Sequence, residues 1–133
     1  MTVISVIVGS TREGRFSEKP AKWILQHLKK QEGVDARLPD LRDFPMPFFD
    51  QPVTPATPGR PAFEHEVVQR WTAAIAQSDG FVFVTPEYTY GPAVLKNAVD
   101  WVLSGVASHG GLLRELRQHG GRAQRAAASR NCH

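Results

Sequence analysis

The sequence is poor in cysteine and has no long hydrophobic run. Its one cysteine, Cys132, cannot form a disulfide within the chain, so the sequence gives no support for an oxidising compartment. The apolar stretch near the N-terminus breaks at Gly9, too soon to span a bilayer, and it lacks the basic n-region and cleavage-like signature of a secretion signal. We therefore expect a cytoplasmic protein that does not bind membranes.

An excess of charge of one sign is also lacking over most of the chain. The formal net charge is +3, but residues 112–133 carry +4 by themselves, which leaves −1 for residues 1–111. The basic segment has neither interleaved aromatic residues nor a recognisable nucleic-acid-binding module. We expect no specific binding to nucleic acid.

Two nucleotide-binding fingerprints and a metal-ligand pattern are missing as well. Neither G-x-G-x-x-G nor G-x-x-x-x-G-K-[ST] occurs, which argues against the dinucleotide fingerprint and the nucleoside-triphosphate loop. His109, His119 and His133 have no carboxylate or thiolate at ligand spacing except the terminal Cys132. No metal site is predicted.

Short apolar runs alternate with amphipathic segments along the chain. With 133 residues and 41% hydrophobic residues, the length and composition suit one domain. Apolar runs predict strands at 3–8, 34–38 and 81–85, and helical spacing of apolar residues predicts helices that include 21–28, 67–75 and 95–102. This order predicts an α/β fold with a parallel sheet and right-handed crossovers, in which the charged second strand lies at an edge.

A long connection without periodicity follows the second strand. Residues 39–61 contain seven of the ten prolines, together with Phe44, Phe48 and Phe49. Connections of this length inside a compact domain are usually functional or interface loops.

The loop after the first strand has the composition of an anion site. It offers the hydroxyls of Ser10, Thr11 and Ser17, the guanidinium groups of Arg12 and Arg15, and the N-terminus of a helix that Ser17 could cap. A monophosphate is the expected ligand. The alternative is an ordinary solvated turn whose arginines lie on the surface.

A second polar loop, 86–91, follows the third strand. Tyr88 and Tyr90 could offer ring faces to a planar heterocycle, and the backbone of residues 87–91 could bind its edge. Alternatively, both tyrosines pack on the next helix and Glu87 is a solvated or capping acid. Because ligands of open α/β sheets bind beyond the carboxyl ends of the strands, one ligand would touch both loops if the first and third strands are neighbours.

These two loops resemble those of the NADPH-dependent FMN reductase family of flavodoxin-like proteins. The family's first loop has a G-S-x-R-x-x-S character, and its later loop reads P-E-Y-N before a helix that opens P-x-x-L-K-N. The resemblance covers about residues 3–103. Thr89 replaces the family's Asn and the segment between Tyr88 and Pro92 is one residue shorter, so we expect weaker flavin binding. The matching residues are Gly9, Ser10, Arg12, Arg15, Ser17, Pro86, Glu87, Tyr88, Pro92, Leu95, Lys96, Asn97 and Trp101.

The resemblance implies a flavodoxin-like three-layer sandwich that binds FMN, with the phosphate on the first loop and the isoalloxazine ring against residues 86–89. NADPH or NADH would donate a hydride to the flavin, which would then reduce a small molecule such as a quinone, azo dye, metal oxyanion or free flavin. Because the cofactor carries this chemistry, no catalytic residue is assigned. The predicted cofactor contacts are Ser10, Thr11, Arg12, Arg15, Ser17, Pro86, Glu87, Tyr88, Thr89, Ser108 and Gly110.

The C-terminal part departs from the family pattern. Residues 108–111 resemble the S-x-G-G loop that follows the fourth strand, but little of that strand precedes them, and no strand pattern follows Leu116. We therefore expect an incomplete FMN-binding domain at 1–111, with the last one or two strands degraded or missing, and a short helix and a basic, disordered tail at 112–133.

An incomplete sheet and an apolar connection also predict association. The third strand would be an exposed edge unless another chain covers it, so we expect a homodimer or homotetramer. Two alternatives stay open: a truncated, catalytically silent remnant that at most binds a partner, and a module that binds a phosphate ligand without redox activity.

Overall fold

The computed structural model describes residues 1–55 and 57–102. The alternation of strands and helices predicted for this part is confirmed, and a short 3-10 helix that was not predicted follows the second strand. The elements are β1 (Thr2–Val8), α1 (Glu18–Lys29), β2 (Val34–Arg37), η1 (Leu41–Asp43), α2 (Glu66–Ala76), β3 (Gly80–Val84) and α3 (Ala93–Asp100).

The three strands form one parallel sheet in the order β2-β1-β3. Ile4 of β1 is in register with Ala36 of β2 and with Gly80 of β3, so β1 lies in the centre of the described sheet. A bridge between Val8 and Asp40 prolongs the pairing beyond the end of β2. The first and third strands are therefore neighbours, which meets the condition for one ligand to touch both loops, and their carboxyl ends lie at the same edge of the sheet.

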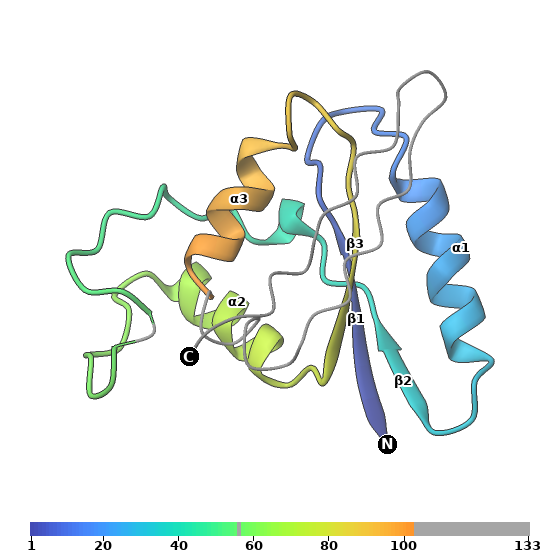
Figure 1. The fold of residues 1–133 in the computed structure, drawn as a ribbon, viewed down its shortest axis with the longest axis horizontal. Coiled ribbons are helices and arrows are strands. Elements are labelled where there is room, and N and C mark those ends of the chain that lie inside the picture. The colour runs from blue at the N-terminus through green and yellow to red at the C-terminus, as the bar shows by residue number, and fades with distance from the viewer. Residues whose placement is uncertain (56, 103–133) are drawn as a thin grey trace, which may run out of the picture.

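Helices cover both faces of this sheet, which gives three layers. Figure 1 shows α1 on one side of the strands and α2 and α3 on the other. Successive residues of β1 point to opposite faces: Val6 and Val8 pack with Ala21 of α1, whereas Ile7 belongs to the larger cluster with Trp71 of α2. Burial on both faces explains why β1 is an almost unbroken apolar run.

Helix α3 fixes the proline-rich connection in place. The Asn97 side chain accepts a hydrogen bond from the Phe49 amide at 2.9 Å and donates one to the Pro47 carbonyl at 2.9 Å. Trp101 donates to the same carbonyl at 3.0 Å and packs edge to face against Phe49 and Phe63. The start of this long segment is therefore held by specific side chains, although 44–55 and 57–65 contain no helix or strand.

Several expectations concern residues that the structure does not describe. Ser108, Gly110, the segment 112–133 and the strands expected to be degraded or missing all lie outside the described ranges. Within those ranges, no helix is long and apolar enough to cross a membrane.

Candidate functional site

The two polar loops lie side by side at the carboxyl edge of the sheet. Both stand at the top of Figure 1, where the chain leaves β1 and β3. The Gly9 amide donates to the Val84 carbonyl at 2.8 Å, and the guanidinium of Arg12 donates to the Tyr88 hydroxyl at 3.4 Å. The same guanidinium lies 5.8 Å from the centre of the Tyr88 ring. One ligand can therefore reach both loops.

A glycine is needed where the first loop leaves β1. A Cβ at Gly9 would lie 2.9 Å from the end of the Leu95 side chain and 3.0 Å from the Cβ of Thr85. Contacts this short would push the end of β1 away from the end of β3 and from α3. Gly9 thus permits the close approach that brings the loops together.

Ser17 stands at the N-cap of α1, as predicted, but its side chain makes no capping hydrogen bond. Its backbone has helical angles, φ −59° and ψ −16°, unlike the extended backbone that directs a capping side chain to the amides of the first turn. The Ser17 hydroxyl is buried and has no hydrogen-bond partner among the described residues. The Nε of Arg15 also has no hydrogen-bond partner there, but it forms an ion pair with Glu18 Oε2 at 3.9 Å.

Arg15 is turned into the protein, and its side chain is only 3% exposed. Nη1 donates to the Ser10 carbonyl at 2.9 Å and to Asp40 Oδ1 at 2.7 Å, while Nη2 is bonded to Asp40 Oδ2. This hydrogen-bonded pair raises the pKa of Arg15 and lowers that of Asp40, against the opposing effect of burial. Both groups are held in their charged forms. Direct contact of Arg15 with a ligand stays a prediction.

A second arginine, Arg42 of η1, forms hydrogen bonds to the backbone of the first loop. Its Nε donates to the Thr11 carbonyl at 3.3 Å and its Nη2 to the Arg12 carbonyl at 2.6 Å. Asp40 positions it, because Oδ1 of Asp40 accepts the Arg42 amide at 3.0 Å and so caps η1. Sequence reasoning missed both residues. A signal for Asp40 existed, since a buried arginine requires an acidic partner, but Arg15 was expected to face a ligand.

The second loop has an uncommon backbone. Tyr88, Thr89 and Tyr90 have φ values of 29°, 52° and 72°, and Gly91 follows at 120°. Each non-glycine residue in this left-handed region costs on the order of 1 kcal/mol or more, and such residues cluster at functional sites. Tyr90 is 89% exposed. The alternative in which both tyrosines pack on the following helix is therefore wrong for Tyr90.

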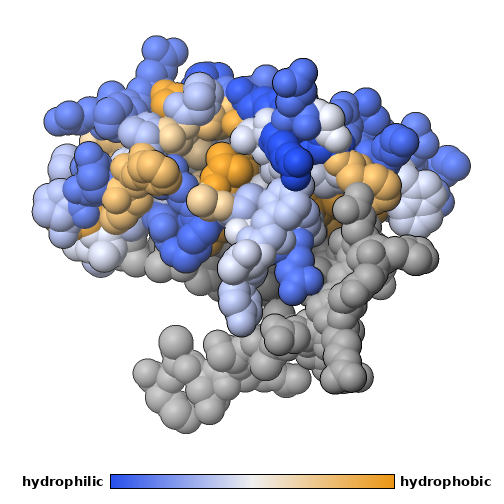
Figure 2. Space-filling model, turned by 90° about the horizontal axis from the view of Figure 1, so that it is seen from above, coloured by the Kyte–Doolittle hydropathy of each residue, from blue (hydrophilic) through white to orange (hydrophobic). Residues whose placement is uncertain are grey.

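The predicted contacts among the described residues all lie on these two loops. Ser10 is buried and its hydroxyl accepts the Arg12 amide at 3.2 Å, whereas Thr11 and Arg12 are exposed. Pro86 is half-buried, and the three residues after it are exposed. Figure 2 views the molecule from the side of the loops and shows hydrophilic side chains interspersed with smaller apolar patches. Contact of these residues with a cofactor stays a prediction.

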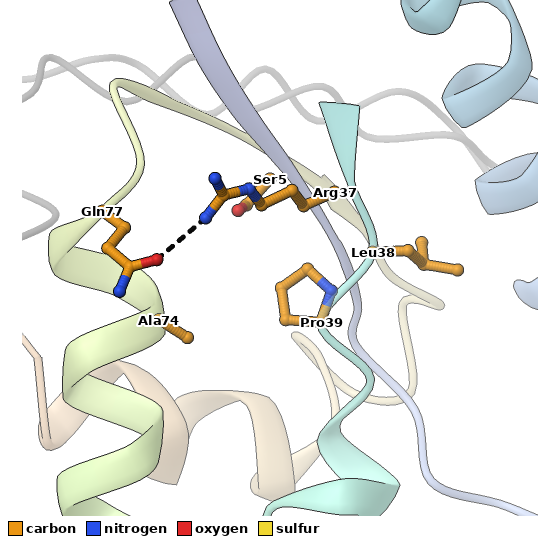
Figure 3. Close-up of a pocket in the computed structure, with 6 residues that line it drawn as sticks. All are labelled: Ser5, Arg37, Leu38, Pro39, Ala74 and Gln77. Carbon is orange, nitrogen blue, oxygen red and sulfur yellow. Dashed lines mark hydrogen bonds between the residues drawn. The ribbon is translucent and has the colours of Figure 1, made fainter. Parts of the chain in front are cut away.

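A separate pocket of about 210 Å³ lies between the end of β2 and α2. Figure 3 shows Arg37 and Gln77 among the residues that line it, and the Arg37 guanidinium donates to the Gln77 side chain at 2.9 Å. Arg37 is also paired with Asp35, and the hydroxyl of Ser5 is bonded to that of Ser78. These polar groups satisfy one another, so the candidate site is the pair of loops and not this pocket.

The chain is similar to known flavin and quinone reductases. The family model of the NADPH-dependent FMN reductases matches residues 2–126. An NAD(P)H-dependent FMN reductase of Schizosaccharomyces pombe is 41% identical over 98 residues, which cover 73% of this chain and 48% of that protein. A quinone reductase of Escherichia coli K12 is 36% identical over 100 residues, covering 74% of this chain and 49% of the relative.

A solved structure shares the fold. The flavoenzyme NAD(P)H:(acceptor) oxidoreductase FerB of Paracoccus denitrificans superposes with a TM-score of 0.61 and 26% identity, over 88% of this chain and 60% of that one. The chain spans about half the length of the curated relatives it matches.

Proposed function

Because the chain belongs to the NADPH-dependent FMN reductase family, we propose that its two converging loops bind FMN and that the complete protein transfers a hydride from NADPH or NADH to this flavin. The proximity of Arg12 and Tyr88 carries this proposal. FMN has a charged phosphate at one end and a flat ring system at the other. A site for it needs an anion-binding loop beside a loop with accessible ring faces.

The first loop fits a phosphate group. The hydroxyl of Ser17 is a buried donor without a hydrogen-bond acceptor among the described residues, and the Nε of Arg15 has only an ion pair with Glu18 at 3.9 Å. Burying a polar group without a hydrogen bond is costly, so the Ser17 hydroxyl indicates a ligand that accepts from it. The exposed hydroxyl of Thr11 and guanidinium of Arg12 add donors on the outer side.

The second loop fits the ring end of FMN. Pro86 is half-buried, Glu87, Tyr88 and Thr89 are exposed, and the strained backbone holds them beside the first loop. FMN supplies the hydride chemistry when bound, and the protein supplies binding and orientation. These residues would keep the ring at the carboxyl edge of the sheet. Thr89 and the shortened loop offer less reach toward the ring edge, and we propose that they weaken flavin affinity.

The names of the relatives indicate the substrates. FMN reductases and a quinone reductase are among them, so we propose a quinone, a flavin or another small oxidised molecule as the electron acceptor. Ser108 and Gly110 stay predicted cofactor contacts. We further propose a homodimer or homotetramer located in the cytoplasm.

A flavin titration of the purified full chain tests the proposed binding. Addition of FMN should quench flavin fluorescence saturably and raise the melting temperature, because a ligand that binds only the folded state stabilises it. Anaerobic NADPH should then bleach the visible flavin absorbance. A chain that leaves FMN fluorescence and its own melting temperature unchanged would refute the proposal.

Arg12→Ala provides the matched test of the site. We expect FMN to bind about tenfold more weakly, equivalent to about 1.4 kcal/mol, because a charge-assisted hydrogen bond to phosphate is lost. Lys30→Ala is the control, since it removes the same charge at the opposite end of α1 and should leave FMN affinity unchanged. Equal affinities of the two variants would exclude Arg12 from the site.

A further inference from the structure

We infer that Asp40 and Arg42 are positioning residues for the phosphate of FMN, which hold the backbone of the first loop so that its amides face the anion. This inference rests on the proposed function. It deepens that function, because it assigns the shape of the phosphate site to residues of η1 and its N-cap that do not belong to the loop.

Three consecutive carbonyls of the first loop are bonded to two guanidinium groups. Arg15 binds the carbonyl of Ser10, and Arg42 binds those of Thr11 and Arg12. The Arg12 carbonyl also accepts the Arg15 amide at 3.2 Å. The direction of every peptide group from residue 10 to residue 13 is thereby set by an arginine.

In a trans peptide the carbonyl and the following N–H point in opposite directions, and the described residues contain no cis peptide. Carbonyls directed toward the two guanidinium groups therefore turn the amides of Thr11, Arg12 and Glu13 away from them. The Arg12 amide donates to the Ser10 hydroxyl. Within the described residues, the amides of Thr11 and Glu13 have no hydrogen-bond acceptor. The two amides without an acceptor lie on either side of the Arg12 amide in the chain, and amides of such a loop can bind an anion.

A buried donor points independently to an anion at this place. The Ser17 hydroxyl lacks a hydrogen-bond partner among the described residues, and Ser17 is more than nine-tenths buried. The Arg15 Nε also has no hydrogen bond there, although it forms an ion pair with Glu18 Oε2 at 3.9 Å. Ser17 belongs to the same loop as the amides. The arrangement is that of a binding site and not of a surface turn.

Asp40 makes this arrangement possible despite its negative charge. A guanidinium that is 3% exposed requires an acidic partner, and Asp40 binds both of its terminal nitrogens. Without the carboxylate, Arg15 would leave the interior and release the Ser10 carbonyl. Asp40 also caps η1 and so holds Arg42 against the loop.

The change in phosphate affinity caused by Asp40→Asn has opposite signs for a positioning role and for a purely electrostatic role. Removal of a negative charge near a phosphate strengthens phosphate binding if only Coulomb attraction acts. If Asp40 positions the loop, Asp40→Asn weakens phosphate binding instead. Asp43 provides the matched control, because it lies in the same η1, is exposed, and its side chain has no hydrogen bond or ion pair among the described residues.

The experiment compares FMN with riboflavin, which lacks the phosphate, in fluorescence titrations of the full chain and its variants. We expect Asp40→Asn to bind FMN at least about tenfold more weakly and riboflavin about as the wild type does. Asp43→Asn should bind FMN no more weakly than the wild type. Arg42→Lys should also weaken FMN binding, because lysine keeps the charge but cannot bind two carbonyls at once as the planar guanidinium does.

The titrations distinguish a failure of the positioning role from a failure of the proposed FMN binding. Wild-type or tighter FMN binding by Asp40→Asn, or equal weakening for FMN and riboflavin, would overturn the inference while the proposed function stands. If circular dichroism shows that Asp40→Asn is unfolded, Arg42→Lys decides alone, and wild-type affinity in that variant overturns the inference. A wild-type chain that binds neither flavin overturns the proposed function and the positioning role together.

Discussion

Arg12 and Arg15 lie in the same loop and have opposite surroundings. Arg12 is exposed and reaches the ring of Tyr88, whereas Arg15 is buried and paired with Asp40. The residue type alone does not distinguish an exposed guanidinium from a buried one that binds the backbone of its own loop. Burial and the presence of an acidic partner distinguish them.

The pair between Arg15 and Asp40 predicts a dependence of stability on pH. Because the pair lowers the pKa of Asp40 in the folded state, its stabilising contribution is complete above the ordinary aspartate pKa of about 3.9. The contribution is lost as the pH falls through the lowered value. Urea denaturation at a series of pH values should therefore show the unfolding free energies of the wild type and Asp40→Asn converging below about pH 4. Curves that stay parallel down to the most acidic pH would contradict this.

At the scale of elements, α3 connects the second loop to the proline-rich connection. Pro92 is its N-cap residue, directly after the strained segment 88–91, and Asn97 and Trp101 hold the connection at Pro47 and Phe49. A shift of α3 would therefore move both segments. We interpret the family's P-x-x-L-K-N pattern as the sequence of this helix contact.

Asn97→Ala tests the contact between α3 and the connection. The substitution leaves the amide of Phe49 without its acceptor, and an unsatisfied buried group costs about 1–3 kcal/mol. Urea denaturation should show a loss of this size in the unfolding free energy. Lys96→Ala is the control on the same helix, because its exposed ion pair with Asp100 contributes about 0.3–0.5 kcal/mol at most. Equal losses in the two variants would show that Asn97 has no special role.

At the scale of the whole molecule, the connection presents an apolar side chain on a fixed backbone. Phe48 is 78% exposed, and its neighbours Pro47 and Phe49 are bonded to α3. A rigidly held, exposed aromatic residue is well suited to anchor a protein interface. The proposed oligomer would place Phe48 in its interface.

Phe48→Ser should therefore lower the molecular mass of the protein in solution. Light scattering coupled to size exclusion should give a dimer or tetramer for the wild type and a smaller species for the variant. Trp23→Ser is the control, because Trp23 is another aromatic residue, 58% exposed, on α1 at the other face of the sheet. A monomeric wild type, or a variant with the wild-type mass, would contradict the prediction.

Local patterns in the sequence were sufficient for the elements and for the position of the two loops. Apolar periodicity, Gly33, Pro39 and Pro92 each act over a few residues, and the helices and strands follow them closely. The alternation of strands and helices restricts how the chain can return to the sheet, but it did not decide whether β1 and β3 are neighbours. Only the resemblance to flavodoxin-like proteins implied that order.

Only the tertiary structure decided which side chains shape the candidate site. Asp40 is 25 residues from Arg15 in the chain, and Arg42 is 30 residues from the Arg12 carbonyl that it binds. No periodicity links positions so far apart, because their contact depends on the pairing of β1 with β2 and on where η1 then begins. The sequence by itself determined the elements and the two loops, since the forces that form them are local. The packed fold alone decided that one arginine of the first loop faces solvent and the other faces an acid.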